Sequence, residues 1–348
     1  MAVTPAPAGT APRGPAERRA PGNVAGIAKQ FLTLREGSIV VITVATIIFF
    51  GASTNNFFTG SNFKTLLPYF APYAIMAAGQ VFVMINGEID LSIGAAYLFI
   101  PFWFHVVHHV GLPVIPALII ALITAGIIGA VNGLFIAVVG ISSFVTTLGM
   151  LFVLDGITLV MSHATPVSIP ATSPTGVGTF AQIFGGGTYS ELIWALGLVA
   201  ILQLVLSLTR WGVYTVAVGG NRLGAAEAGI LVRLVLVRNF VLCAMCAGFV
   251  GILEAVRTTT ATPDPSASND ILFQAISAAV IGGTLLRGGS GTVVGALIGA
   301  LFLGVLHDGL TIKGVNANYL ALYLGLAILI AMTANTFVSR VRTGSGRG

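Results

Sequence analysis

Charge is scarce in this sequence. Only 8% of its 348 residues are Asp, Glu, Lys or Arg, whereas 56% are hydrophobic, and the mean hydropathy is +0.97. A soluble domain carries about 25% charged residues, so the composition excludes an ordinary soluble protein and indicates a polytopic membrane protein. The 44 glycines agree with this conclusion, because small residues let membrane helices pack closely.

Lysine is the rarest charged residue type in the sequence. The three lysines are Lys29, Lys64 and Lys313, and none of them follows a glycine. The phosphate-binding pattern G-x-x-x-x-G-K-[ST] is therefore absent, and this chain has no such loop to hold ATP. No arrangement of paired acid and base residues indicates catalysis either, so we expect this chain to have no enzymatic activity.

Cysteine and histidine give little support for a redox or metal site. Cys243 and Cys246 lie in an apolar helix with no βαβ pattern around them, which favours packing. His105, His108 and His109 share one helix face, but they lie at the end of an apolar run, where an interfacial position is favoured over metal binding. We therefore expect no metal and no cofactor in this chain.

The apolar runs predict an all-α membrane fold, because a helix needs about 20 apolar residues to cross a bilayer. The ten predicted helices are 38–56, 65–86, 91–110, 113–138, 142–162, 190–208, 234–256, 271–286, 291–310 and 317–337. The eighth is short and ends in Gly282 and Gly283. Short, glycine-interrupted segments are typical of broken helices around a transport site.

Basic residues are spread over the ends of these runs rather than gathered in one patch. Cytoplasmic loops carry an excess of Lys and Arg, and cytosolic termini would place most of the 16 basic residues on that side. We therefore expect a disordered cytosolic tail at 1–37, a transmembrane domain at 38–337 and a basic cytosolic tail at 338–348. Topology and anionic lipid headgroups then explain the net charge of +5 without nucleic acid.

The segment 209–233 differs from the other connections. It contains three arginines, a Gly-Gly-Asn turn and an Ala-rich patch at 223–230 that predicts a short helix. An isolated helix of about two turns is marginal in water, so this one needs a partner surface. The pattern predicts a cytosolic loop that docks on another protein.

Two carboxylates stand together in the stretch 87–94, Gly-Glu-Ile-Asp-Leu-Ser-Ile-Gly, between long apolar runs. A carboxylate in hydrocarbon is costly unless water, a cation or a hydrogen-bond donor meets it. In one interpretation, Asp90 caps the following helix and Glu88 is solvated. In the other, both charges belong to a gate or to the permeation route.

Other polar residues inside apolar runs are candidates to line a polar route, because each is costly without a partner. The candidate pathway or gate residues are Gln80, Asn86, Glu88, Asp90, Ser92, Asn132, Asp155 and Gln274. Asn239 and Glu254 are further candidates to line a polar route. Glu254 and Arg257 are three residues apart on a predicted helix, and this spacing favours a structural ion pair. Tyr69 and Tyr73 favour packing.

Four segments of the chain resemble, in order, the signature segments of the membrane permeases of sugar-type ABC importers, the family of the ribose, xylose and autoinducer-2 permeases. They are residues 87–94, 132–149, 219–230 and 281–299. The first is similar to the family's G-G-I-D-L-S-V-G and the third to its G-G-N-x-x-A-A-x-x-x-G-I. Glu88 departs from the family's glycine, and Arg287 stands where a small residue is common.

The resemblance implies a transport subunit in a bacterial cell membrane, with no catalytic residue or cofactor of its own. It implies a partner ATPase that binds ATP and Mg, an extracytoplasmic protein that delivers a sugar or polyol, and a second permease copy in a homodimer. The residues that resemble the ATPase-coupling helix are Gly219, Gly220, Asn221, Arg222, Ala225, Ala226, Glu227, Gly229 and Ile230. An ion-coupled transporter or channel that uses Glu88, Asp90 or Asp155 is left open as the alternative.

Overall fold

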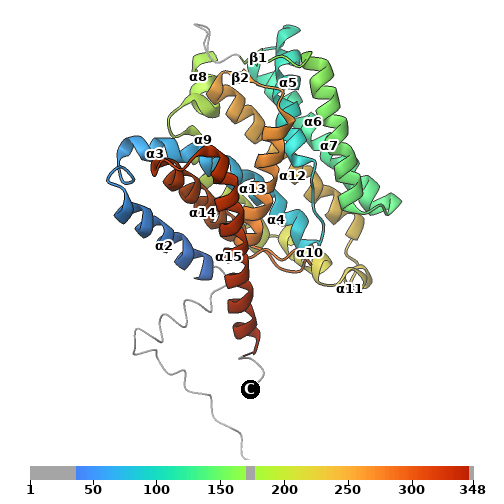
Figure 1. The fold of residues 1–348 in the computed structure, drawn as a ribbon. Coiled ribbons are helices and arrows are strands. Elements are labelled where there is room, and N and C mark those ends of the chain that lie inside the picture. Colours follow the sequence, from blue (N-terminus) through green and yellow to red (C-terminus); the bar gives the residue numbers. More distant parts are fainter. Residues whose placement is uncertain (1–36, 170–176, 345–348) are drawn as a thin grey trace, which may run out of the picture.

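The structure of the protein is a computed structural model that describes residues 37–169 and 177–344 (Figure 1). Residues 1–36 of the tail predicted at 1–37 lie outside the described residues, as do the final residues 345–348, and Gly37 is the first residue of α2. Within these ranges the chain is helical except for one short two-stranded ribbon and the connecting turns. The all-α prediction therefore holds for the part of the chain that the structure describes.

The helices follow one another with short connections. The first half contains α2 (Gly37–Ser53), α3 (Gly60–Leu66), η1 (Leu67–Tyr69), α4 (Ala71–Ile85), α5 (Ile93–His109), α6 (Val114–Leu134), η2 (Phe135–Val139) and α7 (Ser143–Ser162). The second half contains β1 (Val167–Ser168), α8 (Val177–Ala181), η3 (Gln182–Gly186), α9 (Ser190–Leu208), α10 (Arg210–Gly220), α11 (Arg222–Glu227), α12 (Val232–Thr258), β2 (Thr260–Ala261), α13 (Pro265–Ile281), α14 (Val293–Ile312) and α15 (Ala317–Gly344).

Six helical segments in the described ranges are long and apolar enough to cross a membrane. They are Gly60–Ile85, Val114–Val139, Ser143–Ser162, Ser190–Leu208, Val232–Thr258 and Val293–Ile312. Shorter apolar helices lie at Gly37–Ser53 and Tyr319–Ile330. Each of the ten predicted ranges contains helix, but the number of membrane crossings stays a prediction.

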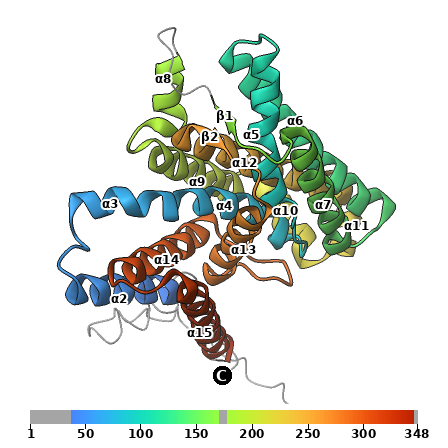
Figure 2. The same ribbon diagram turned by 45° about the horizontal axis from the view of Figure 1, so that its top comes forward.

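The second predicted helix is broken, as Figure 2 shows for α3 and α4, which run almost in line. The break falls at Phe70, between the 3₁₀ turn η1 and the start of α4. Pro68 and Pro72 lie on either side of it. Proline lacks the backbone N–H that an α-helix interior needs, and this explains why the helix is interrupted here.

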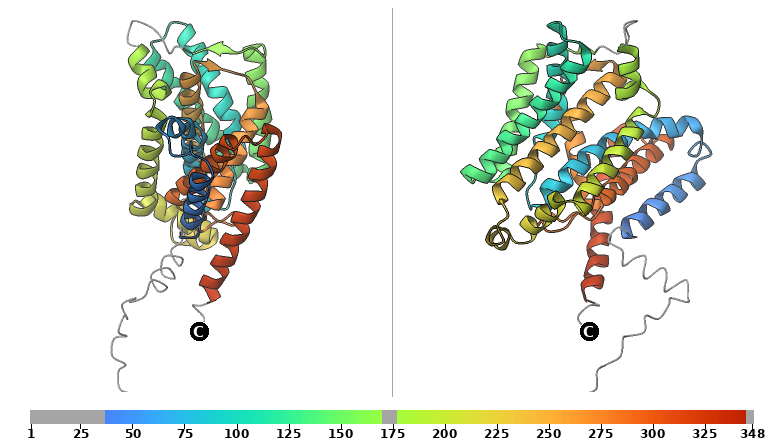
Figure 3. Two further views of the ribbon diagram at one scale, coloured as in Figure 1. Left: turned by 60° about the vertical axis from the view of Figure 1, so that its left-hand side comes forward. Right: turned by 180° about the vertical axis from the view of Figure 1, so that it is seen from behind.

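Helix α12 lies at the centre of the molecule and packs against α4, α5 and α6 (Figure 3). Close approach is possible because small residues stand at the crossing points. A Cβ on Gly129 of α6 would lie 2.3 Å from the Phe240 carbonyl oxygen of α12, and one on Gly251 of α12 would lie 2.2 Å from the Tyr97 carbonyl oxygen of α5. These contacts fix the positions of α5 and α12, which carry most of the candidate site.

The two ends of the bundle are different (Figure 1). At one end β1 pairs antiparallel with β2, with Val167 opposite Ala261 and Ser168 opposite Thr260. At the other end lie α10 and α11. We call these the ribbon end and the α11 end.

The segment 209–233 holds more structure than the sequence predicted. In addition to the short helix α11, it contains the eleven-residue helix α10, whose Thr209 accepts a cap hydrogen bond from the Trp211 amide. At the other end of the chain, α15 continues to Gly344, beyond the predicted end at 337. The domain boundary expected at 338 is therefore not a helix boundary.

Candidate functional site

Three turns meet at the α11 end of the molecule. They are the α4–α5 turn (86–92), the α10–α11 junction (219–221) and the α13–α14 turn (282–292). The Gly289 amide donates to the Ile85 carbonyl (N···O 2.7 Å), and a Cβ on Gly219 would lie only 1.7 Å from the same oxygen. We call this contact of Ile85, Gly219 and Gly289 the glycine junction. It brings together two of the four signature segments, 219–230 and 281–299, at the last residue of α4 and through backbone atoms.

Glu88 is paired rather than solvated. Its carboxylate accepts a hydrogen bond from the Arg222 guanidinium of α11 at 2.5 Å, and only 12% of its side chain is exposed. Arg222 also donates to the Asn86 carbonyl oxygen at 2.9 Å. The ion pair therefore ties α11 to the α4–α5 turn, and the interpretation in which Glu88 faces solvent is wrong.

Asn86 lies in a buried hydrogen-bond network rather than on an open route. Its amide nitrogen donates to the Thr215 carbonyl oxygen (2.9 Å), and its amide oxygen accepts from Asn239 (2.6 Å). The Trp211 indole donates to the Asn239 amide oxygen at 2.7 Å. A buried polar group needs such partners, and here they join the end of α4 to α10 and α12.

Asp90 does not cap the following helix. Helix α5 begins at Ile93, and its N-cap residue is Ser92, which makes no side-chain cap bond. Asp90 Oδ1 instead accepts from the amide and hydroxyl of Ser92, at 2.9 and 2.6 Å. Ser92 Oγ accepts in turn from the Asn132 amide of α6 at 2.8 Å. All three side chains are fully buried, so they form an interior cluster.

The start of α7 holds the same turn from its other side. Ser143 Oγ accepts from the Ile89 amide (3.3 Å), and Thr147 Oγ1 accepts from the Leu91 amide (3.0 Å). These bonds satisfy backbone N–H groups that have no hydrogen-bond partner within a helix. The α4–α5 turn is therefore fixed by α6, α7 and α11 together.

The other predicted pathway residues are scattered. Gln80 is fully buried and accepts from the Cys243 thiol at 3.1 Å. Asp155 is buried on α7, and Gln274 is half-buried on α13, where it interacts with the Tyr73 hydroxyl. The structure therefore does not join the eight predicted pathway residues into one channel.

The predicted coupling residues divide into a packed set and an exposed set. Asn221 caps α11 by accepting from the Gly224 amide at 3.0 Å, and Ala225 packs against Val218 and Val235. Gly219 belongs to the glycine junction, and Ile230 is half-buried. The exposed residues of 219–230 are Gly220, Asn221, Arg222, Leu223, Ala226, Glu227, Ala228 and Gly229. They form an accessible surface over α11.

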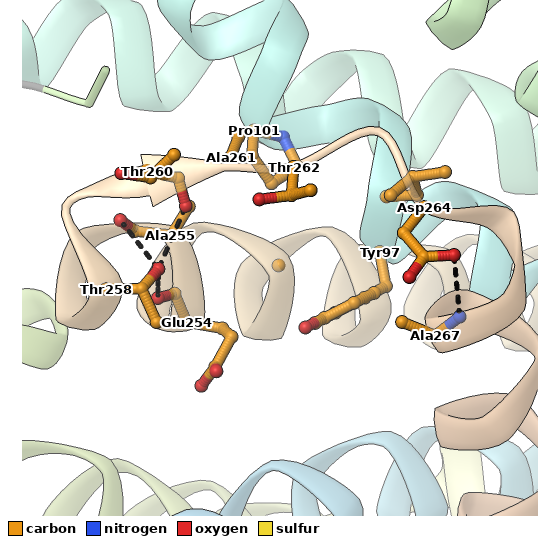
Figure 4. Close-up of a pocket in the computed structure, with 12 residues that line it drawn as sticks. Tyr97, Pro101, Glu254, Ala255, Thr258, Thr260, Ala261, Thr262, Asp264 and Ala267 are labelled. Carbon is orange, nitrogen blue, oxygen red and sulfur yellow. Dashed lines mark hydrogen bonds between the residues drawn. The ribbon is translucent and has the colours of Figure 1, made fainter. Parts of the chain in front are cut away.

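A polar cavity of about 230 Å³ lies at the ribbon end, between α5, α12, β2 and the start of α13 (Figure 4). Figure 4 shows Tyr97 and Glu254 pointing away from the ribbon, toward the same side. The polar residues that line the cavity are Tyr97, Glu254, Thr258, Thr260, Thr262 and Asp264. Hydroxyl and carboxylate groups in this number can bind a small polar solute.

Charged and capping contacts hold the walls of this cavity. The predicted Glu254–Arg257 pair is confirmed, with Arg257 Nε at 3.0 Å from Glu254 Oε2. Arg257 Nε also lies 3.3 Å from Glu191 Oε1 of α9, so one guanidinium serves two carboxylates. Asp264 caps α13 by accepting from the amides of Ser266 and Ala267.

Sequence reasoning missed most of this cavity. Tyr97 stands in an otherwise apolar run, and nothing near it in the sequence marks it as a site residue. Asp264 precedes Pro265, which is a typical helix-start pattern, and this signal would have placed the start of α13 correctly. Glu254 was predicted both as a candidate to line a polar route and as the partner of Arg257, and the structure shows that it lines the cavity.

The described residues contain no group of three or more His, Cys, Asp or Glu side chains placed to hold a metal ion. Cys243 and Cys246 are both free and buried. His105 and His109 stack on each other at the end of α5, with ring centroids 5.5 Å apart. The expectation that the chain carries no cofactor stays a prediction.

The sequence matches known proteins over most of its length. A family model described as "Branched-chain amino acid transport system / permease component" matches residues 62–333. A xylose/arabinose import permease of Sulfolobus acidocaldarius is 33% identical over 91% of this chain and 88% of that protein. A ribose import permease of Escherichia coli K12 is 33% identical over 87% of this chain and 94% of that protein.

A D-allose transport system permease of Escherichia coli K12 is 29% identical over 87% of this chain and 92% of that protein. No solved structure matches. The family match and these relatives confirm the resemblance drawn from the four signature segments. The chain therefore belongs to the branched-chain amino acid transport system / permease component family, and it is a multi-pass membrane permease related to the sugar permeases of ABC importers.

Proposed function

We propose that this chain forms the translocation pathway of an ATP-driven importer for a monosaccharide or a related polyol. The observation that carries the proposal is the match of nearly the whole chain to permeases named for xylose, arabinose and ribose. The polar cavity at the ribbon end gives the proposal a location, because its hydroxyls and carboxylates are suited to bind sugar hydroxyls.

The cavity chemistry supports an uncharged substrate. Glu254 and Asp264 offer carboxylate oxygens that accept from sugar hydroxyls, and the threonine hydroxyls both donate and accept. Arg257, the cation beside the cavity, is engaged by Glu254 and Glu191. The cavity volume of about 230 Å³ is below the 300–1,000 Å³ of pockets for drug-sized ligands, so the cavity suits one small solute.

The orientation follows from the distribution of charge. In this proposal the chain crosses the cell membrane ten times, the α11 end faces the cytosol with both termini, and the ribbon end faces outward. The described chain starts and ends on the side where α11 lies (Figure 1), which supports this orientation. An extracytoplasmic solute-binding protein then delivers substrate to the ribbon end.

The surface over α11 is the proposed docking site for a separate ATPase, which binds ATP and Mg. Leu223 supports this role, because 71% of this apolar side chain is exposed at the end that we place in the cytosol. Closure of the ATPase would move α11, and the Glu88–Arg222 pair would pass that movement to the α4–α5 turn. A second copy of the permease completes the transporter as a homodimer.

Reconstitution tests this function directly. The full chain is placed in proteoliposomes with its ATPase and solute-binding protein, and uptake of labelled D-xylose and D-ribose is measured with and without ATP. We expect uptake only when ATP and both partners are present. Uptake that continues without nucleotide would overturn the ATP-driven mechanism.

The alternative is an ion-coupled transporter, and two buried carboxylates favour it. Asp90 and Asp155 each have one buried oxygen without a hydrogen-bond partner in the described structure. An ion-coupled mechanism predicts uptake that collapses with an uncoupler and that is insensitive to ATP depletion. The reconstituted system therefore separates the two mechanisms in one set of measurements.

A further inference from the structure

The buried cluster at the α4–α5 turn leaves two oxygen atoms without a partner. They are Asp90 Oδ2 and Asn132 Oδ1, and both side chains are fully buried. The two side chains meet at Ser92, whose hydroxyl donates to Asp90 Oδ1 and accepts from Asn132 Nδ2. Buried polar atoms in folded proteins nearly always have a partner, so two in one cluster require an explanation.

The orientation of the Asn132 amide is fixed by hydrogen counting. A serine hydroxyl has one hydrogen, and Ser92 uses it on Asp90 Oδ1 at 2.6 Å. Ser92 Oγ can then only accept, so the amide nitrogen of Asn132 must face it at 2.8 Å. Turning the amide over would place two oxygens together without a hydrogen between them. Both unpartnered atoms are therefore acceptors.

No positive charge of the protein contacts this carboxylate in the described structure. The side chains that the neighbouring helices place around the turn are neutral. They are the Asn132 amide of α6, the Ser143 and Thr147 hydroxyls of α7, and the Cys243 thiol of α12. Within the turn itself, Glu88 is paired with Arg222. An ionised carboxylate buried without a counter-charge is very costly, so the cluster needs a positive partner.

We propose that Asp90 and Asn132 bind a small monovalent cation, either a proton carried by Asp90 or a sodium ion. A proton turns one carboxyl oxygen into a donor, and a sodium ion takes carboxylate and amide oxygens as ligands. Either one neutralises the buried charge. The bound cation stabilises the α4–α5 turn against α6, and this role does not depend on how transport is driven.

Thermal unfolding of the purified full-length protein in nanodiscs tests this site. Sodium chloride is replaced by N-methylglucamine chloride at fixed pH and ionic strength, and pH is varied separately at fixed sodium. Sodium binding predicts a Tm that rises by at least about 2 °C with sodium. Proton binding predicts stability that is present at low pH and is lost as pH rises, because the folded state holds the proton more tightly.

Two variants assign the dependence to this cluster. Asp90→Asn is neutral and similar in shape, and it should abolish the sodium or pH dependence that the unmodified protein shows. Asp155→Asn is the matched control, because Asp155 is another buried carboxylate with an unpartnered oxygen, and it should keep that dependence. If Asp90→Asn does not fold, Asn132→Ser is measured, and it should weaken the dependence.

The outcomes are distinct. A sodium effect that Asp90→Asn removes identifies a sodium ion, and a pH effect that it removes identifies a proton. A protein whose Tm depends on neither, or whose dependence is unchanged in Asp90→Asn and Asn132→Ser, would overturn the proposal in favour of an internal water. Because unfolding is the readout, failure here leaves the transport proposal untouched.

Discussion

The two ends of this permease differ in what lies between their helices. At the α11 end, backbone atoms of Ile85, Gly219 and Gly289 are in direct contact, and the nearby Glu88 carboxylate is paired with Arg222. At the ribbon end, Glu254 and Asp264 line a cavity of about 230 Å³. The comparison indicates that one end is built for tight contact between segments and the other for contact with a solute.

The largest expected effect comes from filling the glycine junction. Gly219→Ala places a Cβ 1.7 Å from the Ile85 oxygen and 2.8 Å from the Gly289 amide, so the segments must separate. Overpacking of this kind costs about 1–3 kcal/mol or more. We expect a clear loss of Tm and of folded protein in the membrane.

Its neighbour provides the matched control. A Cβ on Gly220 would meet no atom within 4 Å, so Gly220→Ala should leave Tm unchanged. Equal destabilisation by the two alanines would mean that the glycine junction is not a tight contact, and the contrast between the two ends would be lost.

The second effect concerns the cavity at the ribbon end. Glu254→Gln and Tyr97→Phe remove a charge or a hydroxyl from its wall and should each reduce sugar uptake by up to about tenfold, because an ordinary hydrogen bond contributes a net of about 0.5–1.5 kcal/mol and about 1.4 kcal/mol is a factor of ten. Reconstituted uptake measures the change, and Tm should fall little. Tyr319→Phe, an exposed tyrosine on α15, is the control. Unchanged uptake in both cavity variants would show that the solute takes another path.

A smaller effect is expected at the Glu88–Arg222 ion pair, which joins the α4–α5 turn to α11. Glu88→Gln, Arg222→Gln and the double variant form a mutant cycle, and we expect a coupling energy of about 1 kcal/mol, since Arg222 is half exposed. The coupling should shrink in high salt. Strictly additive losses of Tm would show that the contact contributes nothing to stability.

The smallest effect is local to α11. Asn221→Ala removes the cap on the Gly224 amide and should cost about 0.5 kcal/mol, the low end of the range for helix caps, because Asn221 is exposed; Asn221→Ser retains a capping oxygen. Faster amide hydrogen exchange over 222–227 in the alanine variant alone is the expected result. Equal exchange rates in the two variants would show that the Asn221 cap does not stabilise α11.

Long apolar runs made much of the fold predictable. Helix α9 has the bounds that hydropathy predicted, Ser190–Leu208, because its length and composition suit a helix surrounded by lipid. Helix α10 was not predicted, because tertiary contacts stabilise it. The Trp211 indole bonds Asn239 of α12, and the Arg238 guanidinium lies over the Trp211 ring. Such contacts leave no local pattern in the sequence.

The sequence indicated which types of residue the candidate site contains, but not which of those residues contact one another. The sequence indicated that Asn86 and Asn239 need buried partners, but it could not pair them, because 153 residues separate them in the chain. Likewise, the sequence indicated a cost for Asp90 without identifying Asn132 in its cluster. Polar residues in apolar runs therefore mark where a network lies, and only the packing of helices decides which residues share it.

The contact between Gly219 and the Ile85 carbonyl has a mechanical consequence. Side chains can absorb a small shift between helices by changing rotamer, but two backbones in direct contact have no rotamer to change. Any displacement of the end of α10 toward α4 must therefore move Ile85 by the same amount. At this point the molecule behaves as a rigid linkage, in which the absence of a side chain makes the movement of one segment the movement of the next.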